Sequence, residues 1–409
     1  MVYYIDVKMY TRIILFVLML IALKVYNYQN LKLEQVIILS RHNVRTPLSK
    51  NLFEFTPKTW PTWNTKSGYL TEKGVLLEGF MGVFFSSWLV KEGLLSKECP
   101  GENSFYVYAN TAQRTIASAE AFLSKAYPKC NLTVHHTTDG QRDPIFNPVI
   151  HNSSEIFKIA AKKQMQRLLQ SLNLNSSYEA IEIILDYKDS TYCTVKHKCD
   201  LINNENKIFV DTGFKPNLEG PLKISKSVID SFIMENYEGF PIDQVAWGKL
   251  QHRSQWDSII DLTRSYHNVI FNTTLVARDV AKPLLKFLHD LLINDEHKVS
   301  LLMGHDANIY TVLNSMGFWP FTLKNQYEVA PAGGKIVFQK WLAQNTGKYY
   351  AKIEYVYQNT DDMRAGRELS LDNPPEFTLL QLYDCEINEI GMCPWDDLIA
   401  IVNALINTN

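Results

Sequence analysis

The chain has 409 residues, of which 46% are hydrophobic, so it can bury a large core and form more than one subdomain. Its formal net charge of −2 offers no broad basic surface for nucleic acid, which we exclude as a partner. A local group of basic residues in this chain therefore indicates a local anion.

Residues 1–30 have the pattern of an export signal. Lys8 and Arg12 precede an apolar run over residues 13–23, which fits the core of a signal peptide and is short for a membrane span. Because residues 24–28 lack a small-residue cleavage pattern, an uncleaved N-terminal anchor is the alternative. We predict a periplasmic or secreted protein that contacts a membrane only if this segment is retained.

A basic segment follows the first strand-like run. Residues 36–39 are Val-Ile-Ile-Leu, which predicts a buried strand, and residues 41–47 read Arg-His-Asn-Val-Arg-Thr-Pro. Arg41 and Arg45 each offer a planar fork of donors that matches phosphate oxygens. His42 lies between them, where it could attack phosphorus as a nitrogen nucleophile. A basic surface turn is the competing interpretation.

The next part of the chain alternates strand and helix. Residues 104–108 predict a strand, and residues 114–125 have helical spacing. This order favours a parallel sheet with helices on both faces. Residues 153–275, by contrast, show almost no strand pattern. Helices are predicted there over residues 154–172, 177–187 and 226–237.

Strand patterns return toward the C-terminus, over residues 298–303, 334–341 and 349–357. We therefore predict an α/β fold with a mostly parallel central sheet flanked by helices and an inserted, mainly helical subdomain. The predicted parts are a signal peptide or N-terminal anchor (1–30), the first part of the α/β domain (31–152), the inserted helical subdomain (153–275) and the second part of the α/β domain (276–409).

A histidine–aspartate pair follows the strand predicted at residues 298–303. Gly304, His305 and Asp306 come directly after it. Because the carboxyl ends of neighbouring parallel strands meet at one edge of a sheet, we expect His305 and Asp306 to lie beside His42. A Gly-His-Asp triplet alone fits an ordinary turn. It indicates a functional site only because the first motif is also present and because both motifs directly follow a predicted strand.

Together the two motifs resemble the signatures of the histidine acid phosphatase family, R-H-x-x-R-x-P and a later His-Asp pair. Asn43 replaces the usual glycine, a change shared with the periplasmic glucose-1-phosphatases of that family. The resemblance extends from about residue 34 to about residue 395. Further stretches that resemble this subfamily are residues 70–74, 108–115, 143–148, 237–241, 246–248 and 333–339.

The resemblance implies a role for each residue of the motifs, in an active site between the two parts of the fold. His42 would be the nucleophile that forms a phosphohistidine, and Asp306 would protonate the leaving oxygen. The implied phosphate-binding residues are Arg41, Arg45, Arg114 and His305. Without the family, Arg114 would be a solvated helix residue. No cofactor and no metal are expected, because the arginines neutralise the phosphate charge.

The substrate range is less clearly encoded. The residues expected to border the substrate pocket are Asn43, Ser49, Asn110, Phe146 and Lys215. Phe146 fits a core aromatic nearly as well, and Lys215 departs from the acidic residue expected in glucose-1-phosphatases, which leaves the sugar preference open. Related phytases carry polar residues at the positions of Leu48 and Ala307, so this chain should disfavour a highly phosphorylated inositol.

We therefore expect an exported acid phosphatase that acts on a small-molecule phosphate monoester, with glucose 1-phosphate as the preferred substrate. A phytase or broad-range acid phosphatase is the alternative, and an inactive, secreted phosphate-binding protein is a remote one. A general acid that must be protonated predicts faster turnover under acidic conditions. The oligomeric state is left open, with a homodimer as one alternative.

Six cysteines agree with export. The sequence alone allows fifteen connectivities, whereas the resemblance and the proximity of the partners favour Cys99–Cys130, Cys193–Cys199 and Cys385–Cys393. In a cytosolic protein they would be free thiols or metal ligands, but a zinc site is not expected because no C-x-x-C pair occurs. His135 and His136 would point in different directions on a strand, so we expect them to be structural or exposed.

Overall fold

The structure is a computed structural model that describes residues 30–138 and 141–407. The predicted signal or anchor segment lies outside these residues apart from Asn30. Within them, the strands are β1 (Leu31–Arg41), β2 (Phe105–Ala109), β3 (Lys207–Phe209), β4 (Asn217–Glu219), β5 (Val299–Gly304), β6 (Lys335–Ala343), β7 (Lys348–Tyr357), β8 (Glu376–Leu379) and β9 (Cys393–Pro394). The helices are α2 (Glu72–Lys91), α3 (Gln113–Ala126), α4 (Glu155–Ser171), α5 (Asn175–Leu185), α6 (Thr191–Thr194), α7 (Pro221–Glu238), α8 (Arg253–Phe271), α9 (Thr274–Ile293), α10 (Asp306–Met316), α11 (Thr360–Ala365) and α12 (Trp395–Asn407), with 3-10 turns η1 (Leu52–Phe55), η2 (Tyr187–Asp189) and η3 (Val245–Gly248).

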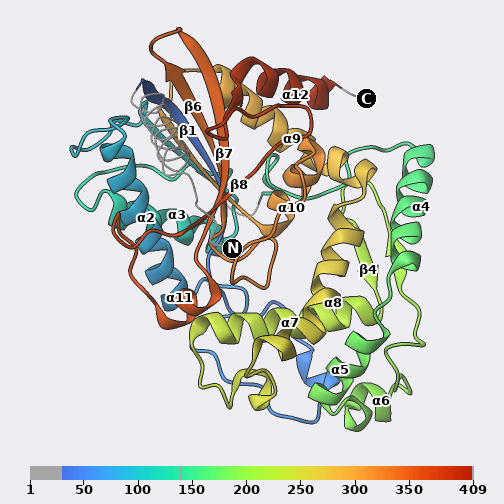
Figure 1. Cartoon of the computed structure of the whole chain (residues 1–409). Helices are drawn as coiled ribbons and strands as arrows, with labels where there is room; N and C mark the ends of the chain where they lie inside the picture. Colours follow the sequence, from blue (N-terminus) through green and yellow to red (C-terminus); the bar gives the residue numbers. More distant parts are fainter. Residues whose placement is uncertain (1–29, 139–140, 408–409) are drawn as a thin grey trace, which may run out of the picture.

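The central sheet has the order β2-β5-β1-β6-β7-β8, and β9 also pairs with β7 (Figure 1). The predicted α/β architecture with flanking helices is confirmed. The expectation of a mostly parallel sheet needs correction, because parallel pairing is confined to β2, β5 and β1 and the remaining pairings are antiparallel. The reason is local: β6 and β7 are joined by a tight turn that includes Gly347, and such a hairpin is necessarily antiparallel.

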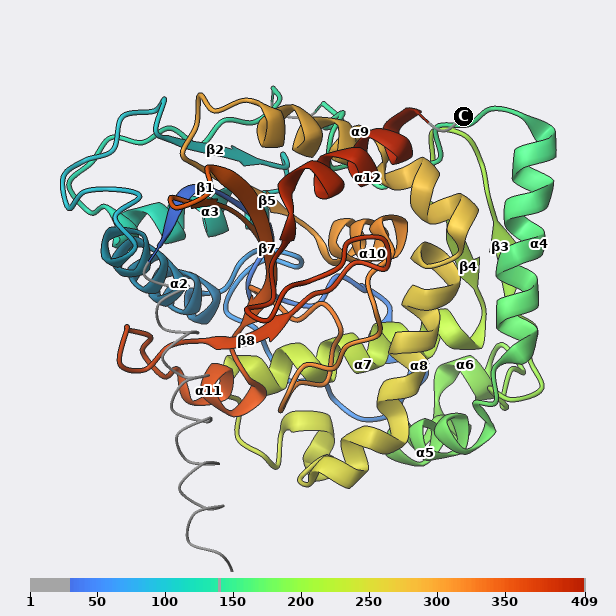
Figure 2. The ribbon, with the colours of Figure 1, turned by 45° about the horizontal axis from the view of Figure 1, so that its top comes forward.

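Strand β1 is buried on both faces. Val36 and Ile38 pack in one apolar cluster with α2 and α3, whereas Ile37 and Leu39 pack in a second cluster with α9 and α10. Figure 2 shows α2 and α3 on one side of the sheet and α9, α10 and α12 on the other. A strand covered on both faces needs apolar residues without alternation, which explains the run over residues 36–39.

Helices α2 and α3 pack closely against each other and against the sheet. A Cβ atom on Gly82 would lie 2.2 Å from the carbonyl oxygen of Phe122, so this approach requires glycine. Thr71 caps α2, because its side chain accepts a hydrogen bond from the N–H of Gly74. Among the described residues, α2 is the one helix long and apolar enough to cross a membrane, and half of that stretch is buried, with Met81, Phe84, Phe85 and Leu89 in the core.

The segment from α4 to α8 lies beside and below the sheet in Figure 1. It is mainly helical, and its strands are the two short strands of the β3–β4 hairpin. The helices predicted over 154–172, 177–187 and 226–237 are confirmed as α4, α5 and α7, although α7 begins earlier, at Pro221. Proline fits this first position because its fixed φ suits a helix and its missing N–H is not needed there. One apolar cluster joins these helices to β1, so the division into two domains stays a prediction.

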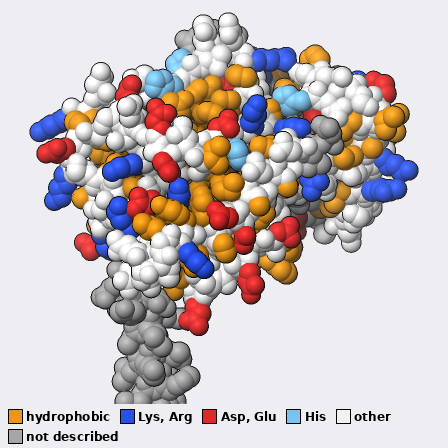
Figure 3. Space-filling model, turned by 90° about the horizontal axis from the view of Figure 1, so that it is seen from above, with side chains coloured by type: hydrophobic (Ala, Val, Ile, Leu, Met, Phe, Trp, Pro, Cys, Tyr) orange, Lys and Arg blue, Asp and Glu red, His pale blue; other side chains and the backbone are white. Residues whose placement is uncertain are grey.

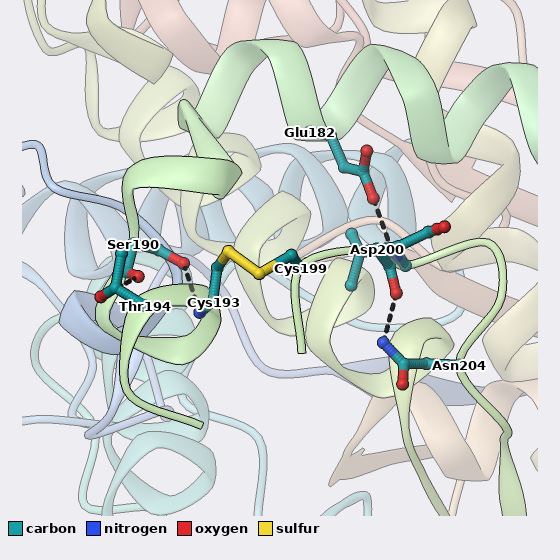
Figure 4. Close-up of a disulfide and its surroundings, with 8 residues drawn as sticks. Glu182, Ser190, Cys193, Thr194, Cys199, Asp200 and Asn204 are labelled. Carbon is teal, nitrogen blue, oxygen red and sulfur yellow. Dashed lines mark hydrogen bonds between the residues drawn. A yellow bond between two sulfur atoms is a disulfide. The ribbon is translucent and has the colours of Figure 1, made fainter. Parts of the chain in front are cut away.

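All six cysteines form disulfides, with the pairing that the resemblance implied: Cys99–Cys130, Cys193–Cys199 and Cys385–Cys393. Beside Cys193–Cys199, Ser190 accepts a hydrogen bond from the N–H of Cys193 (Figure 4). The Asp200 carbonyl accepts another from the Asn204 amide. The disulfide therefore closes a short loop whose flanking residues on both sides are held by hydrogen bonds.

Charge is mixed on the face of the molecule seen from above. Basic and acidic side chains are interspersed there, and hydrophobic side chains gather toward the middle (Figure 3). Neither sign of charge dominates this face, which agrees with the small net charge of the chain. The concentrated positive charge lies instead inside the protein, at the end of β1.

A buried ion pair lies directly beside this end of β1. The side chains of Lys335 and Glu78 are fully buried, with Lys335 Nζ 2.7 Å from Glu78 Oε1. Lys335 Nζ also donates to Ser40 Oγ and to the Gly333 carbonyl, at 2.9 and 3.0 Å. Asn43 Nδ2 donates to the second carboxylate oxygen of Glu78 at 2.8 Å. Each charge is thus matched by hydrogen bonds as well as by its counter-ion, which a buried pair requires.

This network fixes the backbone around His42. The N–H of Gly333 donates to the His42 carbonyl at 3.1 Å. Gly333 has a φ of +69°, and a Cβ atom there would lie 2.3 Å from Asn43 Nδ2, so both its conformation and its surroundings require glycine. The segment before β6 is therefore locked onto the residue that follows β1.

We expect Glu78→Gln to destabilise the protein by roughly 3–5 kcal/mol, because it leaves the Lys335 ammonium buried without a counter-charge. Urea unfolding of the oxidised protein measures this free energy. The control is Glu155→Gln, which breaks the exposed pair with Lys158 and should leave the unfolding midpoint nearly unchanged. Equal midpoints for the two variants would contradict the stabilising role of the buried pair.

Candidate active site

The carboxyl ends of β1 and β5 bring the two sequence motifs together. The strands pair in parallel with Arg41 opposite Gly304, and the N–H of His42 donates to the Gly304 carbonyl at 2.9 Å. The rings of His42 and His305 lie 5.4 Å apart between centroids. The predicted juxtaposition of the two motifs at one sheet edge is confirmed.

His42 is placed to act as a nucleophile. Its side chain is 3% exposed, and Nδ1 lies 2.8 Å from the carbonyl oxygen of Asn43. Because that oxygen can only accept, Nδ1 carries the hydrogen and the lone pair is on Nε2. Burial, together with the charge of Arg114 and the neighbouring His305, holds the pKa of His42 well below its ordinary value. His42 is therefore neutral and has a free nitrogen lone pair.

Two of the arginines are held by buried carboxylates. Arg41 Nη1 lies 2.9 Å from Glu328 Oε1 and also donates to the Ala330 carbonyl. Arg45 Nη2 donates to both oxygens of Asp230, on α7, at 3.0 Å. Burial acts to lower the pKa of Arg41, but the carboxylates of Glu328, Asp306 and Asp230 outweigh it and raise the pKa. Both guanidinium groups are therefore charged and fixed in direction.

Several N–H groups of these arginines have no acceptor among the described residues. They are Nε and Nη2 of Arg41, Nε of Arg45 and Nε of Arg114, and all of them are buried. A buried donor without a partner is costly, and a cluster of four at one place is unusual for a purely structural arrangement. An oxyanion with several acceptor oxygens fits such a cluster.

Arg114, His305 and Asn110 form a hydrogen-bonded chain next to His42. Asn110 Oδ1 accepts from the N–H of Ala112, so it acts as an acceptor for His305 Nε2 at 3.0 Å. His305 Nδ1 then accepts from Arg114 Nη2 at 3.4 Å. Desolvation, together with the charge of Arg45, lowers the pKa of Arg114 to about 10. Arg114 is thus an arginine without a buried carboxylate partner, oriented by a neutral histidine.

Asp306 begins α10, directly after His305. The N–H of Ala307 donates to Asp306 Oδ1 at 2.8 Å, and His267 Nε2, on α8, lies 3.5 Å from Oδ2. Burial acts to raise the pKa of Asp306, but His267, Arg41 and Lys226 hold it well below its ordinary value. Asp306 is therefore a carboxylate in the free protein.

Not every residue expected in the substrate pocket points toward His42. The Asn43 side chain turns the other way, into the buried network with Glu78, because it occupies the side of β1 covered by α2. Phe146 is fully buried, stacks on Tyr108 and packs on Gly304, so it is a core aromatic. These two expectations are corrected.

Two other expected pocket residues are partly accessible. Ser49 is half-buried in the segment after the first motif. Lys215 is exposed, with Nζ 5.0 Å from the Phe271 ring. Desolvation of the ammonium lowers the pKa of Lys215, whereas Asp306 acts to raise it. Their contact with substrate stays a prediction.

The functional residues absent from our sequence interpretation are Asp230, Glu328 and His267. None belongs to a local motif, and their partners lie far away in the chain. Acidic residues within the apolar α7 were the available signal, but that signal does not separate Asp230 from Glu235, which is also buried there.

The adjacent His135 and His136 lie beside β2, where His135 forms a bridge with Tyr108. In the ranges 30–138 and 141–407 there is no group of three or more His, Cys, Asp or Glu side chains arranged to hold a metal ion. His135 stacks on Tyr106 at the edge of the sheet, and His136 is exposed. The pair therefore has the structural and exposed positions that we expected.

Comparison with known proteins agrees with this geometry. A family model described as histidine phosphatase superfamily (branch 2) matches residues 32–358. The chain is 40% identical over 380 residues to glucose-1-phosphatases of Providencia rettgeri and Salmonella typhimurium, covering 91% of this chain and 91% and 92% of the relatives. It is 29% identical over 402 residues to phytase AppA of Escherichia coli, covering 91% of this chain and 92% of that protein.

Solved structures share the fold. Hafnia alvei phytase in its apo form matches with a TM-score of 0.84 and 30% identity, covering 92% of this chain and 98% of the phytase. Citrobacter braakii phytase matches with the same TM-score at 28% identity and the same coverage. Given the family match over most of the chain and the close similarity to glucose-1-phosphatases, the chain belongs to the histidine phosphatase superfamily, branch 2, and is a histidine acid phosphatase that hydrolyses phosphate monoesters.

Proposed function

We propose that this protein is an exported acid phosphatase that hydrolyses sugar phosphate monoesters, above all glucose 1-phosphate, through a phosphohistidine intermediate. The observation that carries the proposal is the cluster of buried, unpartnered guanidinium N–H groups beside the free Nε2 of His42. The preference for glucose 1-phosphate is supported by the 40% identity to two glucose-1-phosphatases.

In the proposed reaction, Arg41, Arg45 and Arg114 bind the phosphoryl oxygens and align phosphorus with His42 Nε2. The lone pair of Nε2 forms the P–N bond while the P–O bond to the sugar breaks, and Asp306 gives a proton to the leaving oxygen. The oxygen of a water molecule then bonds to phosphorus as the P–N bond to His42 breaks, Asp306 takes back a proton, and inorganic phosphate leaves. The electrostatic stabilisation comes from donors already fixed in position before the substrate arrives.

Acidic conditions favour this reaction because Asp306 must carry a proton at the first step. In the free protein its carboxylate is stabilised by His267 and nearby cations. A bound phosphate dianion would neutralise those cations and repel the carboxylate, and both effects raise the pKa of Asp306. Substrate binding and low pH therefore act in the same direction.

Export is supported by the cysteines and by the N-terminal sequence. All six cysteines are paired in disulfides, and such bonds persist in oxidising compartments such as the periplasm or the extracellular space. The basic and then apolar pattern of the first residues fits a secretory signal. The proposed location is therefore periplasmic or secreted.

A phytase is the second candidate, favoured by the fold shared with solved phytases. The specificity argument from Leu48 and Ala307 needs revision. Leu48 is 46% exposed and can border the pocket, but Ala307 is 1% exposed and lies in the apolar core. Because Leu48 is exposed and Ala307 is packed in the core, Leu48 carries the testable part of the argument against distal phosphates.

His42→Ala should abolish phosphohistidine formation and phosphate release, because it removes only the attacking nitrogen. The measurement is trapping of ³²P from labelled glucose 1-phosphate after an alkaline detergent quench, alongside circular dichroism to verify folding. His135→Ala, a change at a histidine whose ring stacks on Tyr106 and, within the described residues, contacts none of the proposed site residues, is the control and should label normally. Label that persists in His42→Ala would mean that another residue attacks.

Asp306→Asn should slow the phosphorylation of His42 far more with glucose 1-phosphate than with an aryl phosphate. An alkoxide is a poor leaving group without a proton, and general acid catalysis typically contributes about 10²–10⁴-fold. An aryl oxide leaves unassisted, so its rate should fall by much less. Single-turnover quench measurements on both substrates provide the comparison, and equal losses would rule out the general-acid role.

Wild-type protein should release phosphate from glucose 1-phosphate with a higher kcat/KM than from phytate, because the exposed Leu48 gives distal phosphates no hydrogen-bond donor. Leu48→Thr should raise kcat/KM for phytate about 5–150-fold if the hydroxyl meets a charged oxygen, corresponding to about 1–3 kcal/mol. Leu371→Thr, at an exposed leucine outside the motifs, is the matched control. If phytate is already the better wild-type substrate, the glucose-1-phosphatase assignment fails and the phosphatase assignment stands.

A further inference from the structure

We propose that His267 is a positioning residue for Asp306 and that the two side chains hold between them the single proton that Asp306 delivers to the leaving group. This inference rests on the proposed function, because it requires Asp306 to be the general acid. His267 lies on α8, in the helical part of the chain, and belongs to neither sequence motif.

The hydrogen bonds of His267 fix which nitrogen faces Asp306. Its side chain is buried, and Nδ1 lies 2.8 Å from the carbonyl oxygen of Thr263, one turn earlier on α8. That oxygen can only accept, so Nδ1 carries a hydrogen. Nε2 then faces Asp306 Oδ2 at 3.5 Å. In the neutral ring Nε2 is an acceptor, and so is the carboxylate oxygen. These two atoms can form a hydrogen bond only if a proton lies between Nε2 and Oδ2.

The ring itself cannot easily turn away from Asp306. It stacks on Tyr310 of α10, with centroids 4.7 Å apart and planes within 9°. Tyr266 contacts it edge-on, and Phe271 lies nearly parallel on α8. Because α10 begins with Asp306 and also carries Tyr310, the helix that holds the carboxylate also holds the ring. This arrangement fixes the two groups relative to each other.

The two oxygens of Asp306 have different partners. Oδ1 accepts from the N–H of Ala307 at 2.8 Å, whereas Oδ2 faces His267. Oδ2 is therefore the oxygen that can carry the proton. In the reaction the proton leaves this pair for the sugar oxygen as the P–O bond breaks, and the pair regains one proton from the water that attacks the phosphohistidine. One proton leaves and one returns in each turnover.

Other ionisable groups surround His267 and Asp306 and also influence the pKa of Asp306. The cations that act on Asp306 are Arg41 on β1, Arg114 on α3, Lys226 on α7 and Lys215 before β4. The neutral groups near it are His305, Tyr266, Tyr310 and Tyr355. Among these groups, His267 alone contacts the Asp306 carboxylate from α8, and after the opposing effect of burial its hydrogen bond is the largest influence on the pKa of Asp306.

His267→Phe tests the inference because phenylalanine preserves the stacking on Tyr310 but has no ring nitrogen. His267 acts to lower the pKa of Asp306, so its loss should raise that pKa and keep Asp306 protonated to higher pH. The descending limb of the single-turnover phosphorylation rate with glucose 1-phosphate should move up by about one to two pH units. Below that limb, the rate should fall tenfold or more because the carboxyl is no longer oriented.

With an aryl phosphate, the single-turnover rate of His267→Phe should stay within about threefold of wild type, because that leaving group needs no proton. His267→Gln can donate to Oδ2 without carrying a charge, so its rate with glucose 1-phosphate should lie between those of wild type and His267→Phe. The matched control is His289→Phe, which changes another buried histidine, on α9, and should leave rate and profile unchanged. Thermal unfolding of each variant verifies that the fold is kept.

The outcomes separate this inference from the proposed function. A descending limb that stays in place in His267→Phe, or an equal loss on sugar and aryl substrates, means that His267 only packs and overturns the inference while His42 and Asp306 keep their roles. If wild-type protein forms no phosphohistidine from glucose 1-phosphate, or if Asp306→Asn slows both substrates equally, the proposed function fails and the inference fails with it.

Discussion

Burial of three guanidinium groups beside one histidine is the constraint on which the rest of the site depends. Buried charges are costly unless they are paired and hydrogen-bonded. Glu328 and Asp230 meet this requirement for Arg41 and Arg45 by direct contact, whereas Arg114 hydrogen-bonds the neutral His305 and the Gly68 carbonyl. Among the described residues, Arg114 therefore has no carboxylate in direct contact, and in the proposed function a phosphate dianion supplies negative charge at this position. The same lack of a direct counter-ion explains why desolvation and Arg45 lower the pKa of Arg114 to about 10.

This local field also decides which groups carry protons. It adds to burial in lowering the pKa of His42 and of His305, and it outweighs burial in keeping Asp306 ionised. A dianion bound among the arginines offsets their field at Asp306 and raises the pKa of that carboxyl, while Nε2 of His42 already carries its free lone pair. In the proposed mechanism, one binding event thus leaves the nucleophile ready and favours protonation of the general acid, so that substrate binding couples to catalysis through charge.

The parts of the structure that depend on local pattern could be predicted from the sequence. The apolar runs at residues 36–39 and 299–303 predicted β1 and β5, and the motifs at their ends predicted that His42 and His305 meet. Side-chain direction could not be predicted, because it depends on packing against distant segments. Asn43 hydrogen-bonds Glu78 of α2, and the Phe146 ring packs against Gly304. The compensating carboxylates were also missed. Arg41 and Glu328 are 287 positions apart and Arg45 and Asp230 are 185 apart, so no local pattern connects them.

These distant carboxylates also orient the guanidinium groups. They bind one edge of each guanidinium and leave the N–H groups of the other edge directed toward the proposed phosphate site. Glu328 and the Ala330 carbonyl occupy Nη1 of Arg41 and leave Nε and Nη2 without acceptors. Asp230 occupies Nη2 of Arg45, the Thr46 carbonyl occupies Nη1, and Nε is left. A guanidinium is planar and rigid, so fixing one edge fixes the direction of the other. Asp230 lies on α7 and Glu328 lies in the segment before β6, so both the helical part and the sheet part of the fold orient the arginines. The three guanidinium groups therefore reach this arrangement only when the two parts are packed together.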